Sequence, residues 1–574
     1  MNPSAPTRPE RTAASTRPAG ARELLSPRLC FIAALCLAAA VFAIYSPTLR
    51  FQFILDDHRF TNDPRIQSSG HVWDYFANYV WAQFTGGPPS FYRPVFILWL
   101  RINFILSELS PWGWHLLSIA KHVAVALLLG LLVWKLLRDR VAALLAATLF
   151  ALHPAQTESV AWVTVPDPLM SICILGALLL YLRYVDGVSA SERAVEKKSR
   201  KAAHAEKQQA STRLLVTSAA VCFTAMLAKE TAIIFPAVIF VVALFVPRSR
   251  ATDEPNKDAF RVRVLQALRQ TAPYLCVAVL YLLLRFNALE GKLGAQTQHL
   301  PWRTVVLSWP TTLWFYIKVM LWPSKSYAFA DPTLADKFSM RDVLLPVLGV
   351  LCVIAILAVA GWWAWKKARR ELSDEQAIDV DYALLISASL LIFPILLTLN
   401  LNALNPGDFL HGRYTYLPLA GLMLLVATGW HLTTTLRVPL LGAASLLAVA
   451  FAILTVQQEQ PWKYDLTLFT AAHELAPHNG PVAQNLANAR VQAALQLDEE
   501  GRCVEAMPVF QEVTQEYPQD WFAWAGLGDC YVQLNELPKA EESLHRAADL
   551  SHNPRVTQQW QQLRANMGLP NSAQ

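Results

Sequence analysis

Hydrophobic residues along this chain gather into long runs instead of alternating with polar residues. A helix that crosses a bilayer needs about 20 consecutive, mostly apolar residues. Eleven segments meet or approach that length: 29–48, 115–137, 141–153, 167–186, 213–229, 231–247, 273–288, 343–365, 381–401, 414–432 and 438–456. One of them, 141–153, reaches it only with its flanks. The pattern predicts an all-α fold with a polytopic domain of about 11 transmembrane helices.

Two further apolar stretches, 94–107 and 304–322, carry charge or proline inside them. Arg101 lies within the first stretch, and Pro310 and Lys318 lie within the second. An ionised side chain at the centre of a span is costly. We therefore expect both stretches to lie at the membrane surface or to re-enter it.

Basic residues between the runs predict the topology. They form clusters at Arg193–Lys207, Arg248–Arg269 and Lys366–Arg370, and Arg8, Arg11, Arg17, Arg22 and Arg28 precede the first run. Cytoplasmic loops carry an excess of Lys and Arg. With the N-terminus inside, all these clusters fall inside only if 94–107 and 304–322 do not cross. This topology makes the first run a signal anchor and places residues 457–574 outside.

Composition supports a membrane protein and excludes other classes. Of the 574 residues, 54% are hydrophobic and 16% are charged, whereas soluble domains average about 25% charged residues. The chain is therefore not a string of soluble domains. The net charge of +6 is mild, and its clusters alternate with hydrophobic runs, which favours membrane orientation over nucleic-acid binding.

Residues 457–574 are polar and rich in Gln, Glu and Ala, and they show a helical repeat. Side chains at the offsets of a 34-residue tetratricopeptide repeat (TPR) are Trp524, Leu527, Gly528, Tyr531, Ala540, Leu544 and Ala547. An earlier unit includes Ala506 and Phe510, and a degenerate third unit begins near Trp462. The tail is thus predicted to be a short TPR α-solenoid. It is either a cap packed on the membrane domain or a docking surface for a partner protein.

The eight cysteines show no spacing typical of metal ligands. Six lie in hydrophobic runs, where we expect inert side chains. Cys503 and Cys530 lie in the polar tail, where a disulfide is an open alternative if the tail is outside the cytoplasm. No zinc spacing and no Gly-rich phosphate loop is present in the sequence, so we expect no metal site and no soluble nucleotide donor.

Two adjacent carboxylates, Asp56 and Asp57, follow the first run. One interpretation is a solvated loop. The other is sugar transfer, in which an acceptor hydroxyl loses its proton as its new bond forms and a carboxylate accepts that proton. A prenyl-phosphate leaving group departs as an anion, so no second acid is required. Either Asp56 or Asp57 is then the base, and its neighbour orients it or binds a cation.

Further polar residues lie at the edges of runs: His115, His153, Glu158, Lys229, Glu230, Arg413 and Tyr414. Lys229 and Glu230 form a local ion pair on one interpretation, and Lys229 holds a lipid phosphate on the other. Arg413 either extends to lipid headgroups or binds phosphate. The histidines are expected more often to be structural than functional.

Several ordered motifs carry a family resemblance across residues 28–456. They are Leu55-Asp-Asp57, Tyr92-Arg-Pro94, Arg101-Ile-Asn103, Pro111-Trp-Gly-Trp-His115 with His122, Leu152-His-Pro154 with Thr157-Glu-Ser-Val-Ala-Trp162, Leu227-Ala-Lys-Glu-Thr231 and Arg413-Tyr-Thr-Tyr-Leu-Pro418. With the repeat tail that follows, the chain resembles the transmembrane and tetratricopeptide-repeat-containing O-mannosyltransferases. More broadly, it is similar to the GT-C class of polytopic glycosyltransferases.

The resemblance implies inverting transfer of a sugar, mannose in the animal members, from a dolichyl- or polyprenyl-phosphate donor. Its acidic pair corresponds to Asp56 and Asp57, and its basic residues near the donor phosphate correspond to Lys229 and Arg413. The substrate-binding set that we expect is Arg93, His115, His153, Glu158, Asp167, Lys229, Glu230, Arg413 and Tyr414. A hydroxyl acceptor on protein Ser/Thr, a glycan or a lipid is implied, and a divalent cation stays an open alternative.

One departure concerns the segment after Trp162. The family usually has Ser-Gly-Arg-Ala-Asp there, whereas this chain has Val163-Thr-Val-Pro-Asp167. The arginine is therefore missing, which puts the handling of donor or acceptor in doubt. This departure and the short repeat array suggest a bacterial member that acts at the periplasmic face of the inner membrane.

The expected domains are a cytoplasmic basic tail (1–28), a GT-C-like membrane domain (29–456) with a catalytic loop (49–114), and an extracytoplasmic TPR domain (457–574). The alternative function is a non-catalytic membrane scaffold whose repeats recruit proteins. A transporter is disfavoured, because transporters concentrate charges within spans or show two similar halves.

Overall fold

The computed structural model describes residues 26–84, 90–196, 201–246, 257–292, 300–325, 330, 334–403 and 410–570, although not the side chains of 189–208 and 257–259. Most of the basic N-terminal tail, the side chains of Arg193–Lys207 and part of Arg248–Arg269 lie outside this set. The described residues form helices and no strand, with one isolated bridge between Ala330 and Leu410. The predicted all-α class is confirmed.

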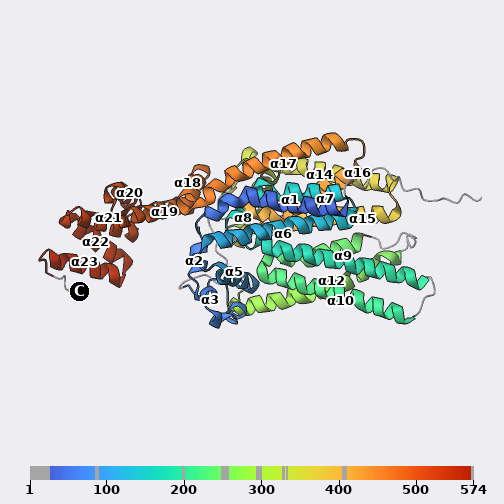
Figure 1. Ribbon diagram of the computed structural model, residues 1–574, viewed down its shortest axis with the longest axis horizontal. Helices are drawn as coiled ribbons and strands as arrows, with labels where there is room; N and C mark the ends of the chain where they lie inside the picture. The colour runs from blue at the N-terminus through green and yellow to red at the C-terminus, as the bar shows by residue number, and fades with distance from the viewer. Residues whose placement is uncertain are drawn as a thin grey trace, which may run out of the picture.

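Long helices run roughly parallel in an elongated bundle, and the C-terminal helices project from one end of it (Figure 1). We call this end the repeat end. The long helices are α1 (Pro27–Tyr45), α6 (Pro111–Leu137), α9 (Asp167–Glu196), α10 (Lys201–Ala228), α12 (Lys257–Ala288), α13 (Trp302–Leu321), α14 (Leu345–Glu371), α15 (Asp374–Leu397), α16 (Tyr416–Leu432) and α17 (Arg437–Glu459).

Short helices connect the long ones. Those between α1 and α6 are α2 (Asp57–Thr61), α3 (Pro64–Gln67), α4 (Asp74–Ala77) and α5 (Pro94–Ser107), and Figure 1 shows α2, α3 and α5 at the repeat end. Further along the chain are α7 (Arg140–Ala151), α8 (Thr157–Ala161) and α11 (Phe235–Phe245).

Ten helices among the described residues are long and apolar enough to cross a membrane, so the chain is a multi-pass membrane protein. This set differs from the eleven predicted spans in three places. Trp302–Leu321, expected at the surface, meets the length criterion, whereas α7 and α11 are shorter apolar helices. A 12-residue helix is about 18 Å long, less than the apolar thickness of a bilayer.

Contacts of α13 nevertheless keep both of its ends at the repeat end. Just before it, Leu300 N donates to Asn402 Oδ1 over 2.9 Å, in the segment that follows α15. Just after it, the Pro323 carbonyl accepts from Gln458 Nε2 over 2.5 Å, at the end of α17. Both flanking segments of α13 therefore lie near the repeat end, and the surface location expected for 304–322 stays a prediction.

The segments on either side of the short helix α7 contact the two ends of α17. Asp139, just before it, lies 3.6 Å from Arg437 at the start of α17. The Leu152 carbonyl, just after it, accepts from Thr455 Oγ1 over 2.9 Å, near the end of α17. Helix α7 therefore lies alongside α17.

Small residues allow α15 and α16 to approach each other closely. A Cβ on Gly421 of α16 would lie 2.7 Å from the Ser387 carbonyl oxygen and 2.8 Å from Leu391 N, both in α15. Ser387 Oγ donates to the Gly421 carbonyl over 2.6 Å. Lipid supplies no hydrophobic drive for helices to associate, so close backbone packing and interhelical hydrogen bonds hold such pairs.

The tail consists of helices α18 (Asp465–Leu475), α19 (Gly480–Glu499), α20 (Cys503–Glu516), α21 (Trp521–Gln533), α22 (Leu537–Ser551) and α23 (Pro554–Asn566). Consecutive helices pack as pairs around two small cores. In the second core Leu544 of α22 is buried against Gly528 of α21. This packing of a large residue on a glycine is what the repeat offsets predicted.

We predict that Gly528→Ala destabilises the tail by about 1–3 kcal/mol, because the added Cβ would lie 2.7 Å from Leu544 Cγ and 3.3 Å from its backbone nitrogen. Protease susceptibility of the tail during a temperature ramp measures this. Gly480→Ala is the matched control, since no atom lies within 4 Å of its Cβ position among the described residues. Equal resistance of both variants would contradict the predicted packing.

Candidate active site

The acidic pair begins α2, at the repeat end of the bundle. Asp57 is 0% exposed. Its Oδ1 accepts from Thr164 Oγ1 over 2.6 Å, and its Oδ2 accepts from Ile54 N over 3.2 Å. Asp56, by contrast, is half-buried. The two neighbouring carboxylates therefore have different surroundings, as expected if only one of them acts as a base.

Burial raises the pKa of the Asp57 carboxyl from 3.8 to about 7, against the lowering effect of its bonds from Thr164 and Ile54 N. An ionised carboxylate loses hydration when buried, which favours the neutral form. Asp57 therefore changes charge near neutral pH. A group with that pKa suits proton transfer at neutral pH, because both of its forms are accessible.

The backbone just before the acidic pair is held by the tail. Leu55 has φ +52°, in the left-handed region that non-glycine residues seldom adopt. Its N–H donates to Asp465 Oδ1 over 3.0 Å, and His58 Nε2 lies 2.8 Å from Asp465 Oδ2. Asp465 begins α18, so a carboxylate of the repeat domain fixes the loop that carries Asp56 and Asp57.

An apolar cluster reinforces this connection. Trp462, before α18, is fully buried and stacks on Trp162 with ring centroids 6.3 Å apart. Phe51 and Ile54, from the loop before the acidic pair, pack in the same cluster as Leu468 of α18. The first part of the tail is thus built into the membrane domain.

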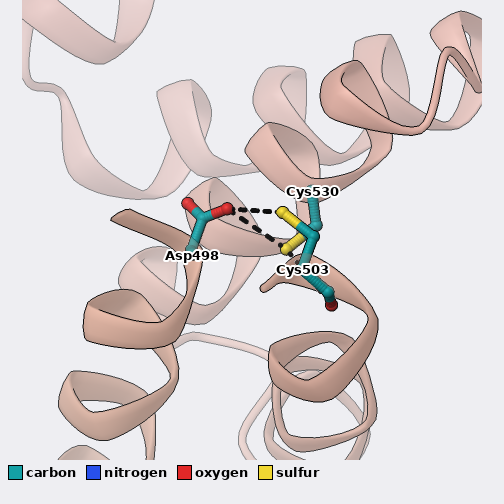
Figure 2. A group of neighbouring side chains, drawn as sticks. All are labelled: Asp498, Cys503 and Cys530. Carbon is teal, nitrogen blue, oxygen red and sulfur yellow. Dashed lines mark hydrogen bonds between the residues drawn. The ribbon is translucent and has the colours of Figure 1, made fainter. Parts of the chain in front are cut away.

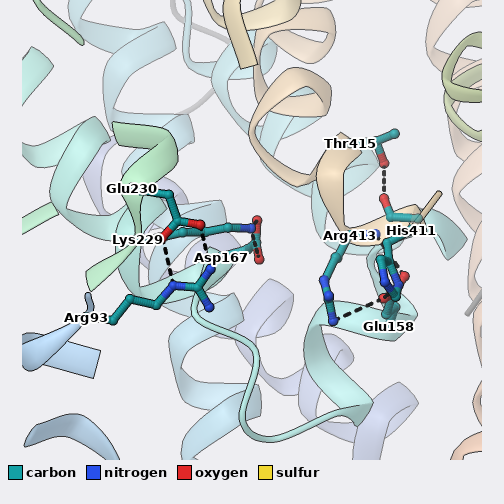
Figure 3. A network of polar contacts seen from close by, with 9 residues as sticks. Arg93, Glu158, Asp167, Lys229, Glu230, His411, Arg413 and Thr415 are labelled. Carbon is teal, nitrogen blue, oxygen red and sulfur yellow. Dashed lines mark hydrogen bonds and ion pairs between the residues drawn. The ribbon is translucent and has the colours of Figure 1, made fainter. Parts of the chain in front are cut away.

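The local pair of Lys229 with Glu230, one of the two interpretations of these residues, is not formed. Lys229 Nζ lies 2.6 and 2.7 Å from the two carboxylate oxygens of Asp167, at the start of α9. Glu230 instead pairs with Arg93, whose Nε donates to Glu230 Oε2 over 2.8 Å. Figure 3 shows the two pairs side by side. Extended backbone at Lys229 (φ −156°, ψ +133°) separates the two side chains.

Glu158 of α8 holds the segment before α16. Its Oε1 lies 2.9 Å from His411 Nδ1, and its Oε2 accepts from Arg413 N over 2.9 Å. The Arg413 guanidinium lies 3.6 Å from Glu158 (Figure 3). It also lies 4.5 Å from the Trp162 ring centroid. Arg413 therefore lies between a carboxylate and an aromatic face.

Some of the remaining predicted residues lie in this region, and others hold the surrounding structure. Tyr414 belongs here, since its ring centroid lies 5.1 Å from Lys229 Nζ. His115 is fully buried beside Phe51. His153 is structural: its Nδ1 accepts from Ala155 N, so its Nε2 carries the proton that bonds to the Met320 carbonyl over 3.0 Å.

Sequence reasoning did not select several residues of this region: Trp99, Lys121, Thr164, His411 and Asp465. Lys121 lies in α6, is 4% exposed, and its Nζ has no hydrogen-bond partner within the described part of the chain. A lysine inside the apolar run 115–137, well away from its basic end at Lys135, was the signal that could have identified it.

A separate group in the tail has ligand atoms suited to a metal ion. Asp498, Cys503 and Cys530 are buried, and their ligand atoms lie within 4.8 Å of one another (Figure 2). Both cysteines are free thiols and donate to Asp498 Oδ1, over 2.7 Å from Cys503 and 3.4 Å from Cys530. Burial raises the pKa of both thiols, which keeps them protonated. The disulfide considered from the sequence is not formed in this structure.

This chain is similar to known proteins both in its tail and over most of its length. The tail matches the Tetratricopeptide repeat family over residues 499–567. Protein O-mannosyl-transferase TMTC3 of Homo sapiens is 25% identical over 90% of this chain and 54% of its own length. Protein O-mannosyl-transferase TMTC1 of Homo sapiens is 25% identical over 86% and 56%. The predicted resemblance and the TPR tail are confirmed.

The chain spans about half the length of these curated relatives. A higher identity, 33%, is found with Protein O-mannosyl-transferase Tmtc1 of Drosophila melanogaster, over 26% of this chain and 18% of that protein. Among solved structures, the oligosaccharyltransferase of Archaeoglobus fulgidus has a TM-score of 0.41 and 14% identity, covering 80% of this chain and 59% of that chain.

We predict that Lys229→Met lowers the free energy of unfolding by about 3–5 kcal/mol, because Asp167 would keep a buried charge without its partner. Lys229→Met combined with Asp167→Asn should regain most of this loss. Thermal unfolding in detergent micelles measures both.

Lys135→Met is the control for this prediction. Its partner Asp186 is 59% exposed, so the change should cost less than about 1 kcal/mol. A Lys229→Met protein as stable as the Lys135→Met protein would show that the buried pair is not formed.

Proposed function

We propose that this chain is a membrane glycosyltransferase that moves a sugar from a polyprenyl-phosphate donor to an acceptor hydroxyl. The curated relatives are named protein O-mannosyl-transferases, which supports mannose as the sugar and a protein Ser/Thr as the acceptor. A glycan or lipid hydroxyl is the alternative acceptor. The GT-C class is part of this proposal.

One observation carries the proposal: a fully buried carboxylate lies at the repeat end of a membrane bundle, where it accepts hydrogen bonds from Thr164 and from a backbone N–H. Asp57 is that carboxylate, and Lys121 interacts with it. Charged groups are costly at such depth and are retained mainly where they bind or react. A surface loop without chemistry would not require this burial.

The reaction assigns a distinct task to each group. Asp57 takes the proton of the acceptor hydroxyl as its oxygen bonds to the anomeric carbon of the sugar. The bond from that carbon to the phosphate oxygen breaks, and its electron pair stays on the phosphate. Inversion follows from attack on the face opposite the leaving group. Asp56 orients the loop or the acceptor, and the charged pairs of Figure 3 shape the donor site.

The repeats extend from the same end of the bundle as the acidic pair (Figure 1). We assign them the docking of an acceptor or partner protein, at the extracytoplasmic face of the membrane. In a bacterial cell this is the periplasmic face of the inner membrane. The domain limits 1–28, 29–456 and 457–574, with the loop 49–114, belong to the same proposal.

The function is tested with the purified chain, a panel of radiolabelled polyprenyl-phosphate sugars, and peptides rich in Ser and Thr. Transfer from polyprenyl-phosphate mannose to a hydroxyl is expected. Transfer from none of the panel, with a folded protein whose repeats capture a defined partner, would favour the scaffold alternative.

Separate substitutions of the acidic pair test the base. Asp57→Asn should reduce the transfer rate about 10²–10⁴-fold, the usual contribution of general-base catalysis. Asp56→Asn should reduce it less. Asp74→Asn is the control in the same loop, because Asp74 is 42% exposed and forms an ion pair with the neighbouring His71. Full activity of the Asp56→Asn/Asp57→Asn protein would remove the catalytic assignment.

The pH dependence follows from the Asp57 pKa. The carboxyl is protonated below about pH 7 and cannot accept a proton there. The transfer rate should therefore rise about tenfold per pH unit toward pH 7 and level off above it. Thr164→Val removes a bond that lowers this pKa, so its inflection should move to higher pH. A profile that is flat from pH 5.5 to 8 would contradict Asp57 as the base.

A further inference from the structure

Lys121 is a buried cation whose bonding capacity is unused. Its side chain projects from α6, its exposed fraction is 4%, and no acceptor bonds to its Nζ among the residues that the structure describes. An ammonium group without water is costly to bury unless it is paired and hydrogen-bonded. It can donate three hydrogen bonds. This cost requires an explanation beyond packing.

The other cations of the region are already engaged. Lys229 is paired with Asp167, Arg93 with Glu230, and Arg413 with Glu158. A ligand that bound Lys229 would have to displace two contacts of 2.6 and 2.7 Å from a buried carboxylate. A ligand that bound Lys121 would displace no hydrogen bond that the described residues make.

A second unpartnered donor lies beside Lys121. Lys121 Nζ lies over the Trp99 ring of α5, 5.5 Å from its centroid, a cation–π contact that uses no hydrogen bond. The buried Nε1 of Trp99 has no acceptor either, within the described ranges. Two adjacent donors without acceptors favour a ligand that brings oxygen atoms and negative charge. Phosphate esters have this chemistry.

The position of Lys121 relates this ligand to the acidic pair. Lys121 interacts electrostatically with Asp57 and with Asp167. An anion on Lys121 would therefore lie near the carboxylate to which we assign the proton transfer, and the lysine would offset the repulsion between the two negative charges.

We propose that Lys121, with the Trp99 indole N–H beside it, binds the phosphate group of the donor and of the polyprenyl phosphate that leaves. This inference rests on the proposed function and assigns the phosphate to a residue other than Lys229 and Arg413. The negative charge on the phosphate increases by one as its bond to the sugar breaks. A fixed ammonium group nearby stabilises that increase, which contributes to rate as well as affinity.

The test uses the full chain in nanodiscs and three probes: a polyprenyl phosphate, the uncharged polyprenol of the same length, and inorganic phosphate. Wild-type protein should bind the polyprenyl phosphate at least tenfold more tightly than the polyprenol. Lys121→Met should lose that preference while its affinity for the polyprenol stays unchanged. Lys121→Arg should retain most of the preference. Trp99→Phe should weaken it less than Lys121→Met does.

Lys135→Met is the matched control, because it is the same change in the same helix at the opposite end of the bundle. It should bind all three probes as the wild type does. If inorganic phosphate binds in a Lys121-dependent way and as tightly as the polyprenyl phosphate, the anion site stands and free phosphate is its ligand. An unchanged preference in Lys121→Met would overturn the inference.

Stability separates a binding role from a structural one. Removing a buried charge that has no partner should raise the melting temperature of Lys121→Met, whereas removing a structural lysine would lower it. A lowered melting temperature, with Lys121→Arg also losing the phosphate preference, would count against the proposal. Lys121-dependent phosphate binding without sugar transfer from any donor would refute the proposed function and keep the anion site.

Discussion

The architecture of the repeat end depends on the cost of burying ionised side chains. An ionised side chain is costly at this depth without a partner, and several of the partners here come from distant parts of the chain. Lys229 reaches Asp167 at the start of α9, Arg93 reaches Glu230, and Glu158 holds the segment before α16. These pairs therefore fix how the ends of α9, α10 and α16 meet. Lys121 and Glu459 have no hydrogen-bond partner among the described residues, and in our proposal a phosphate ligand supplies the partner of Lys121.

The tail is part of the membrane domain's construction as well as a repeat array. Asp465 bonds to the strained backbone at Leu55 and to His58, and Trp462 stacks in the adjoining apolar cluster. A left-handed leucine costs free energy that surrounding contacts must offset. Because those contacts come from α18, the geometry of the acidic pair depends on the attached tail. Residues of α18 and of the first part of α19 pack in this cluster, whereas the later helices extend away from the bundle (Figure 1).

Sequence patterns identified the membrane helices, the repeat offsets and most of the polar residues at the repeat end. They were less successful with segments near the length limit for a span. Helix α13 is long enough to cross, yet its flanking segments bond to one end of the bundle. Lys229 and Glu230 are neighbours in sequence, yet the extended backbone between them directs each to a different partner. His153 was grouped with the substrate residues and instead holds backbone groups.

The sequence alone determined the class of the protein, a multi-pass membrane protein with a TPR tail. The length of the hydrophobic runs, the basic residues that flank them and the 34-residue period are local properties of the sequence, so they can be recognised without knowing the fold. Tertiary structure alone decided which charges are paired and which are available. Pairing in a low-dielectric region depends on distances of a few ångströms between residues far apart in the chain, such as Lys229 and Asp167. For the same reason, the sequence placed Lys121 only within an apolar run. The structure shows that its Nζ has no hydrogen-bond partner among the described residues.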